Sequence, residues 1–110
     1  MRTTFAVLAE QNRRRILDEL RGGERSVGEL VDCLGLSQPA VSKHLRVLRD
    51  ADLVTARVDA QHRRYRLQPA RLAEIDAWLE PYRRFWDARL GALKQYLEQE
   101  DKQNPSPPEV

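Results

Sequence analysis

The apolar positions of the chain recur at two different spacings, and each spacing predicts a different kind of element. Residues 4–9 and 12–20 have helical spacing, and their expected apolar anchors are Phe5, Leu8, Ile16, Leu17 and Leu20. Residues 53–58 and 64–67 instead alternate and are rich in β-prone side chains, with the polar residues 59–62 between them. The pattern therefore predicts two N-terminal helices and, later in the chain, a two-stranded hairpin with a polar, basic tip.

Between these parts lie the signals of two short helices joined by a tight turn. Ser26 and Glu29 have the spacing of a capping box, which starts a helix that should end near residue 33. Gly35 supplies a positive-φ position at which that helix can stop. Ser37 is a good N-cap for the next helix, and Pro39 fits its first turn. Two short helices across a glycine-containing turn predict a helix-turn-helix.

The second of these helices, over residues 37–50, has a narrow apolar face made of Val41, Leu45 and Leu48. Its other positions carry small, hydrogen-bonding and cationic side chains, which suit entry into a DNA major groove about 12 Å wide. The DNA-binding residues expected on this helix are Ser37, Gln38, Ala40, Ser42, Lys43, Arg46 and Arg49. His44 lies at the apolar edge, where a packed structural role is favoured over a DNA contact.

Basic residues of the hairpin extend the predicted DNA-binding surface. Arg57, His62, Arg63 and Arg64 would project from or near its tip toward the DNA backbone or minor groove. The alternative is that these charges only protect a sheet edge from aggregation. For the basic run at residues 13–15, a solvated helix face is favoured over phosphate contacts.

The last element should be one long helix, continuous but kinked at Pro81, or two nearly aligned helices, over residues 69–98. Its apolar side chains repeat at steps of three and four, and a small domain cannot cover so long a stripe. We expect the surplus to pack against a second copy of the chain; the alternatives are an apolar ligand or a different partner protein. The predicted interface comprises Phe5, Leu8, Leu72, Ile75, Leu79, Tyr82, Trp86, Leu90, Leu93 and Leu97.

Composition and charge indicate how many domains the chain forms and where DNA would bind. A chain of 110 residues with 41% hydrophobic and 33% charged residues predicts one globular domain, residues 1–99, followed by a polar, disordered tail at 100–110. The net charge is only +2, but residues 37–66 carry +4 and residues 70–110 carry −2, so the positive charge is concentrated where DNA is expected. The absence of a secretory signal or a long apolar run predicts a cytoplasmic protein without a membrane partner.

Reactive side chains are few. For the single cysteine, Cys33, a small buried residue is favoured over a redox or metal role, which stays open as the alternative. Two histidines do not complete a recognisable catalytic or metal site. We therefore expect no enzyme activity, no cofactor and no metal. The predicted fold class is mainly α with a small β-hairpin, a winged helix-turn-helix with a long C-terminal dimerisation helix.

The segment 36–54, LSQPAVSKHLRVLRDADLV, resembles the recognition region of the ArsR/SmtB family of bacterial repressors, and the upstream segment 12–17, NRRRIL, does so more weakly. The similarity extends over nearly everything up to residue 99. It implies a homodimer with terminal helices at the interface, which binds an inverted repeat in double-stranded DNA and blocks transcription until an inducer releases it. The inducer is unknown, and the same surface could serve activation.

Many members of that family sense metals, but this sequence departs from their usual sites. Ser26 and Gly28 stand where the resemblance places a pair of cysteines, and neither can supply a thiolate. The other common site needs histidine on the terminal helix, and residues 69–98 contain none. The resemblance therefore implies a regulator that does not respond to metal through either route, while a site assembled from two copies stays open.

Overall fold

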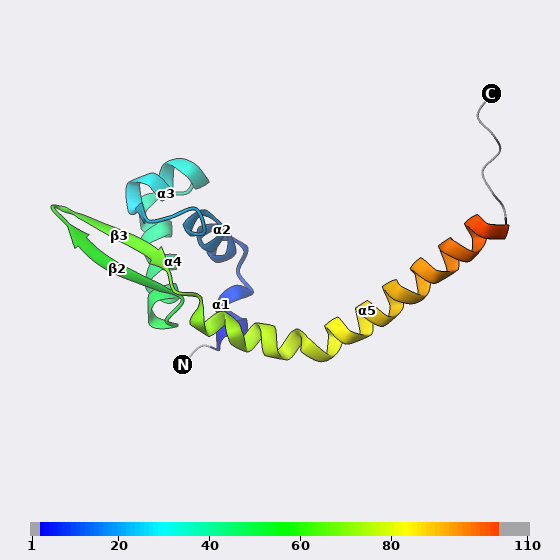
Figure 1. Cartoon of the computed structure of the whole chain (residues 1–110). Helices are drawn as coiled ribbons and strands as arrows, with labels where there is room; N and C mark the ends of the chain where they lie inside the picture. The colour runs from blue at the N-terminus through cyan, green and yellow to red at the C-terminus, as the bar shows by residue number, and fades with distance from the viewer. Residues whose placement is uncertain (1–2, 104–110) are drawn as a thin grey trace, which may run out of the picture. The chain divides into compact units, whose positions relative to one another are not determined.

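The computed structural model describes residues 3–103. Its elements are α1 (Thr4–Leu8), α2 (Gln11–Leu20), β1 (Arg25–Ser26), α3 (Val27–Leu34), α4 (Gln38–Asp50), β2 (Val54–Asp59), β3 (His62–Leu67), the 3-10 turn η1 (Pro69–Arg71) and α5 (Leu72–Gln103) (Figure 1). The chain forms two compact units that divide after Asp76. The predicted fold class is confirmed: helices dominate, and the sheet is small.

The helix-turn-helix forms through the local signals that the sequence carries. Ser26 Oγ accepts from the Glu29 amide and the Glu29 carboxylate accepts from the Ser26 amide, each at 3.2 Å, which completes the capping box of α3. Gly35 ends α3 with φ 67°, a conformation that costs a residue with a Cβ about 1–2 kcal/mol. Ser37 caps α4, and Pro39 lies in its first turn. The predicted capping and turn are confirmed.

The hairpin is tighter than predicted and belongs to a three-stranded sheet. Asp59 pairs with His62, so the loop is only Ala60-Gln61, and both ends of the predicted tip belong to the strands. The third strand, β1, was not predicted; its two residues pair antiparallel with β3, in the order β1-β3-β2. A two-residue strand leaves no alternating pattern, so only its pairing with β3 defines it.

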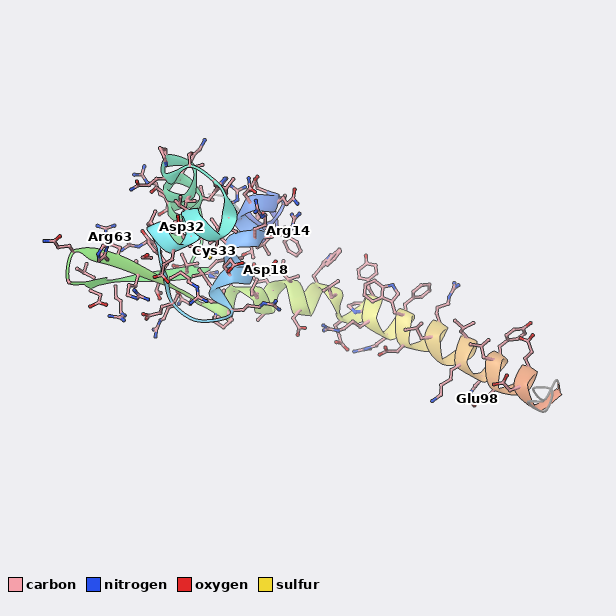
Figure 2. All side chains as sticks on the ribbon, turned by 90° about the horizontal axis from the view of Figure 1, so that it is seen from above. Arg14, Asp18, Asp32, Cys33, Arg63 and Glu98 are labelled. Carbon is pink, nitrogen blue, oxygen red and sulfur yellow. The ribbon has the colours of Figure 1, made fainter. Side chains whose placement is uncertain are left out.

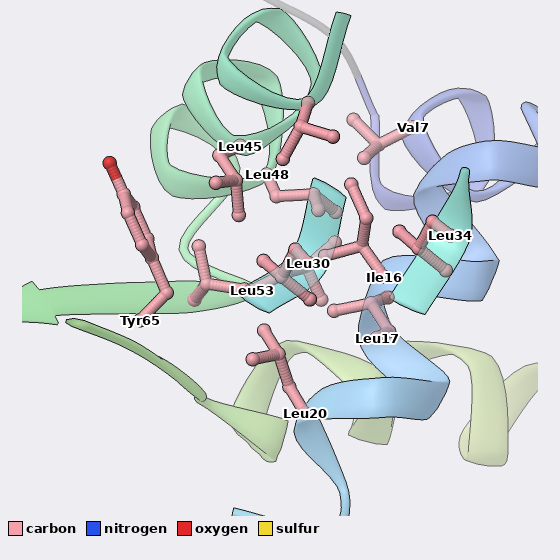
Figure 3. Close-up of a cluster of buried hydrophobic side chains, with 12 residues drawn as sticks. Val7, Ile16, Leu17, Leu20, Leu30, Leu34, Leu45, Leu48, Leu53 and Tyr65 are labelled. Carbon is pink, nitrogen blue, oxygen red and sulfur yellow. The ribbon is translucent and has the colours of Figure 1, made fainter. Parts of the chain in front are cut away.

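The core of the first unit draws on every helix from α1 to α4 and on the sheet (Figure 3). The predicted apolar face of α4 is confirmed, because Val41, Leu45 and Leu48 are all fully buried. The anchor predicted at Phe5 is wrong: its side chain is 44% exposed, and α1 buries Thr4 and Val7 instead. With only five residues, α1 presents one narrow face to the core, and Phe5 lies outside it.

The basic run at residues 13–15 is more than a solvated helix face. Arg13 Nε donates to the Val7 carbonyl at 2.6 Å, and Arg14 Nη1 donates to the Leu8 carbonyl at 2.7 Å, so both bind the C-terminal end of α1. Arg15 Nη2 donates to the Leu34 carbonyl at 2.8 Å. The last carbonyls of a helix have no intrahelical donor. The three arginines therefore satisfy helix ends, and one of those ends lies directly before the helix-turn-helix turn.

The second unit contains most of α5, and the helix is continuous across Pro81. It begins after η1 and reaches Gln103, so the prediction that disorder begins at residue 100 is wrong for residues 100–103. Glutamate, lysine and glutamine are good helix formers, and polarity alone does not end a helix. Residues 104–110 of the predicted tail lie outside the described residues.

Candidate nucleic-acid interface

The candidate DNA-reading face lies on α4, opposite its buried side. Gln38, Ser42, Lys43, Arg46 and Arg49 are exposed. The N-cap Ser37 is also exposed, but its hydroxyl accepts from the Ala40 amide at 3.3 Å, and Ala40 is only partly exposed. The three fully buried side chains on the other side fix the rotation of the helix against the core. Of the predicted residues, Gln38, Ser42, Arg46 and Arg49 line one groove, whereas Ser37, Ala40 and Lys43 lie outside its lining.

This face forms one wall of an open groove of about 880 Å³. The groove lies between α4, the start of α3 and the hairpin; its polar and charged lining consists of Ser26, Asp32, Gln38, Ser42, Arg46, Arg49, Asp50, Gln61, His62, Arg63 and Tyr65. Cationic, amide and hydroxyl groups therefore converge on one concave surface. Such groups bind phosphates and base edges, and carboxylates accept from the cytosine amino group.

Sequence reasoning missed Asp32 and Gln61 as groove residues. Asp32 follows Gly28 by one helical turn, and both lie on the exposed side of α3, so a wheel of that helix would have found it. Gln61 occupies the hairpin loop, whose shortness the alternating pattern did not reveal. Figure 2 labels Asp32 on α3 and Arg63 on the hairpin.

The predicted basic residues of the hairpin divide between two faces of the sheet, although Arg57 and Arg63 also line a small pocket together with Arg49. Cross-strand partners point to the same face of a sheet, and successive residues point to opposite faces. Val58 pairs with Arg63, and both point to the face of the sheet that carries Tyr65. Arg63 lines the groove, as does His62. Arg57 pairs with Arg64 on the other face, where a smaller pocket of about 240 Å³ gathers them with Arg66 and Glu24.

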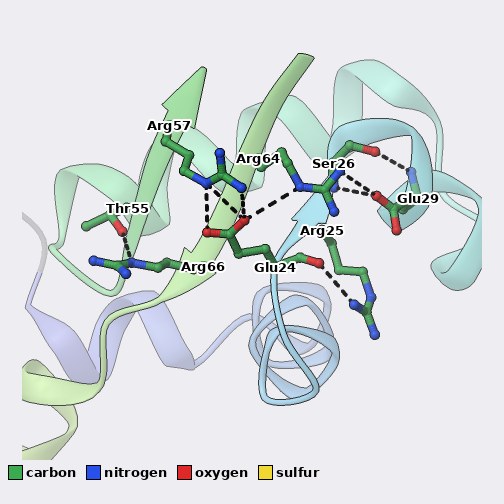
Figure 4. Close-up of polar contacts among 8 residues, drawn as sticks. All are labelled: Glu24, Arg25, Ser26, Glu29, Thr55, Arg57, Arg64 and Arg66. Carbon is green, nitrogen blue, oxygen red and sulfur yellow. Dashed lines mark hydrogen bonds and ion pairs between the residues drawn. The ribbon is translucent and has the colours of Figure 1, made fainter. Parts of the chain in front are cut away.

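Arg57 and Arg64 also have acidic partners, whereas Arg63 has none within residues 3–103. The Arg57 guanidinium binds both carboxylate oxygens of Glu24, and Arg64 lies within ion-pair distance of Glu24 and Glu29 (Figure 4). The hydrogen bond from Arg57 lowers the pKa of Glu24 below its ordinary value. The hydrogen bonds from the Ser26 amide and hydroxyl lower the pKa of Glu29. Both acids are therefore ionised at neutral pH.

His44 packs between the helices, in the structural role that the sequence favours. Its side chain is 16% exposed, and Nε2 lies 3.9 Å from Glu10 Oε2, at the start of α2. Its Nδ1 is buried and has no hydrogen-bond partner among the described residues. His44 therefore joins the supporting side of α4, not its reading face.

The prediction of a buried Cys33 is wrong, because the side chain is exposed. Leu30 and Leu34 mark the buried side of α3, and Cys33 lies about a quarter turn from the middle of that side.

Within residues 3–103, the His, Cys, Asp and Glu side chains form no group of three or more that could hold a metal ion. Along the same residues, no helix is both long enough and apolar enough to cross a membrane.

The predicted dimer residues differ in their surroundings. Leu8 and Leu72 are partly buried against the core of the first unit, and Ile75 and Leu79 are also partly exposed. The others are about half exposed or more: Phe5, Tyr82, Trp86, Leu90, Leu93 and Leu97. Trp78, Phe85 and Tyr96 add further exposed aromatic rings to α5. An apolar stripe therefore runs uncovered along this helix.

A helix-turn-helix followed by a hairpin that shares its groove defines a winged-helix DNA-binding regulator. Residues 10–56 match the family described as "Bacterial regulatory protein, arsR family". HTH-type transcriptional regulator Rv2034 of Mycobacterium tuberculosis is 41% identical over 96 residues, which cover 87% of each chain. Transcriptional repressor SdpR of Bacillus subtilis is 29% identical over 72% of this chain and 88% of that protein.

A solved structure described as an ArsR-like transcriptional regulator from Rhodococcus sp. RHA1 superposes with a TM-score of 0.66. It is 36% identical and covers 86% of this chain and 87% of its own. The chain therefore belongs to the ArsR family of DNA-binding transcriptional regulators, as its resemblance to that family predicted.

Proposed function

We propose that this protein is a repressor that binds a palindromic operator as a homodimer. The observation that carries the proposal is a groove in which the exposed face of α4 meets Arg63 of the hairpin. A helix with slim polar side chains at its N-terminal end fits the major groove, and a hairpin beside it reaches the adjacent backbone or minor groove.

The side chains of α4 divide by chemistry into base readers and phosphate binders. Arg46 can bind guanine in a bidentate manner, and Gln38 can do so with adenine. Ser42 donates or accepts at either base, and Ala40 offers a methyl group to thymine. Lys43 and Arg49 suit phosphates, which position the protein without carrying sequence information. On the hairpin, Arg63 and His62 supply further backbone contacts.

The dimer follows from the apolar stripe of α5. Exposed leucines and aromatic rings lie on this helix over several turns, and contiguous exposed apolar surface of this kind marks an interaction site. A second copy would cover it through the same residues, because a two-fold interface is self-complementary. Two recognition helices related in this way sit about 34 Å apart, so the half-sites should be one turn of DNA apart.

Repression is the proposed outcome because SdpR is named a transcriptional repressor, and an operator-bound dimer blocks access to DNA. Ser26, which caps α3, and Gly28 occupy the places of the thiolate pair in metal-sensing members, so we propose release by something other than a metal at that site. Binding to chromosomal DNA would place the protein in the cytoplasm.

The test is capture of sheared genomic DNA by the purified protein, with sequencing, while its mass in solution is measured in parallel. Enrichment of one palindromic site by a dimer supports the proposal and supplies the operator. Salt-sensitive binding without an enriched site refutes sequence-specific recognition. A monomer that binds no DNA favours the alternative, in which the aromatic side of α5 binds a different protein.

A further inference from the structure

Glu24 lies on the face of the sheet that points away from the groove, and the backbone holds it there. The chain reverses at Gly22-Gly23, where Gly23 has φ 132°, and then forms β1. Pairing of Arg25 with Tyr65 and of Ser26 with Arg64 fixes the residues that follow Glu24 against β3. The Glu24 carboxylate therefore contacts the hairpin, although Glu24 belongs to a segment that precedes the helix-turn-helix.

The carboxylate meets two arginines that face each other across the hairpin. Arg57 and Arg64 are directly paired in the β2–β3 register, and like charges in that position repel. Glu24 accepts from Arg57 Nε at 3.0 Å and from Arg57 Nη2 at 2.8 Å. Arg64 Nε lies 3.6 Å from the same carboxylate. Glu24 thus offsets the repulsion within the pair.

These contacts limit what the two arginines can do with DNA. Glu24 occupies the Nε and Nη2 edge of the Arg57 guanidinium, which is the edge that a phosphate would bind in a bidentate manner, and its negative charge repels a phosphate from the remaining donors. Glu29 adds a second acid, 3.5 Å from Arg64 Nη1. Among the described residues, Arg63 has no such acidic partner and lies on the groove face. The pairings therefore leave one of these three hairpin arginines available to DNA.

We propose that Glu24 is a specificity-determining positioning residue, which withholds Arg57 and Arg64 from DNA phosphates so that the hairpin presents Arg63. On random DNA a freed arginine can bind whichever phosphate lies nearest, whereas on the operator the base contacts of α4 fix the register of the hairpin, so withholding the two arginines weakens random binding more than operator binding. The inference rests on the proposed function, because it concerns discrimination between operator and random DNA.

The experiment compares wild type with Glu24→Gln on the captured operator and on a random duplex of equal length, between 50 and 200 mM salt. Glu24→Gln removes the carboxylate and frees the arginines. Each freed arginine that binds a phosphate steepens the plot of log affinity against log salt by about 0.9. Glu24→Gln should therefore bind random DNA more tightly than wild type does, and this gain should be larger at low salt. For each such phosphate, the gain at 50 mM salt is about 3.5-fold larger than the gain at 200 mM salt.

Asp59→Asn is the matched control, because Asp59 lies on the same face of β2 as Arg57 and its loss removes the same charge. Asp59 acts on Arg57 through its charge, without a hydrogen bond to that arginine. It should raise affinity for both duplexes alike and leave their ratio and the salt slope unchanged. Equal behaviour of Glu24→Gln and Asp59→Asn would overturn the inference, since it would show that only net charge matters. Adding Arg57→Gln to Glu24→Gln should remove the extra steepness that Arg57 caused.

Arg57→Lys repeats the test without altering the acid, should Glu24→Gln fail to fold. Lysine keeps the charge but lacks the planar fork that binds both carboxylate oxygens, so it should also steepen the salt dependence on random DNA. An unchanged slope contradicts the inference. The wild-type measurements distinguish a failure of the proposed function from a failure of the Glu24 inference. If wild type does not prefer the operator, the proposed function is refuted. If wild type prefers the operator and Glu24→Gln keeps the same preference, only the role of Glu24 is refuted.

Discussion

Replacement of Arg46 and of Arg63 by alanine should affect DNA binding in two different ways. Both side chains are exposed and line the same groove, so each variant removes one positive charge from one surface. Arg46 lies on α4, where a bidentate contact to guanine is worth about 1–3 kcal/mol of discrimination. Its removal should therefore weaken operator binding by about 5-fold to about 160-fold and change random-duplex binding much less.

Arg63→Ala should instead weaken binding to both duplexes and reduce the salt slope by about 0.9 for each phosphate that the side chain neutralises in wild type. Fluorescence anisotropy titrations of the two duplexes at several salt concentrations measure both quantities. Arg46→Lys keeps the charge of α4 but lacks the guanidinium fork, so its sequence preference should be as weak as that of Arg46→Ala. If Arg63→Ala relaxes sequence preference while Arg46→Ala only lowers the salt slope, the assignment of roles is wrong.

Three further predictions test the core, the dimer and the Glu24 contacts. Leu45→Ala should lower the free energy of unfolding by about 2–5 kcal/mol, because Leu45 is fully buried beneath α4; chemical denaturation measures this, and a decrease well below that range would contradict the packing. Leu90→Glu should convert the dimer to a monomer in analytical ultracentrifugation, whereas Gln95→Glu, on the opposite side of α5, should not; two unchanged dimers would exclude the proposed interface. The pKa of Glu24 is lowered from 4.5, so the stability that Glu24 contributes is present above pH 4.5 and is lost as the pH falls through the lowered value. The difference in melting temperature between wild type and Glu24→Gln should therefore disappear only below about pH 4.5. If this difference already disappears near neutral pH, the pairing is contradicted.

Local signals make the helix-turn-helix predictable from the sequence. Ser26, Gly35 and Ser37 act on the residues beside them, so their effects can be inferred without knowledge of distant contacts. The apolar face of α4 is equally predictable, because helical spacing alone selects Val41, Leu45 and Leu48.

The remaining features depend on residues that are far apart in the chain. The alternating pattern predicts the hairpin but not its register, and the register decides that Arg57 shares a face with Arg64 and not with Arg63. The sequence pattern predicts a solvated Arg15, because the carbonyl that it binds belongs to Leu34, nineteen residues further along the chain. Glu24 belongs to no motif, and only the pairing of β1 with β3 reveals its contact with Arg57.

The third strand also has a consequence for folding and for the design of fragments. The β2–β3 hairpin closes over two residues, whereas β1 must find β3 across some forty residues of chain, which is entropically and kinetically harder. We expect β1 to join late and to detach early, so the Arg25 and Ser26 amides should exchange hydrogen sooner than those of α4. A fragment cut just before α3 would keep both helices of the motif but would release the hairpin from its third strand. The smallest autonomous DNA-binding piece must therefore begin upstream of Glu24.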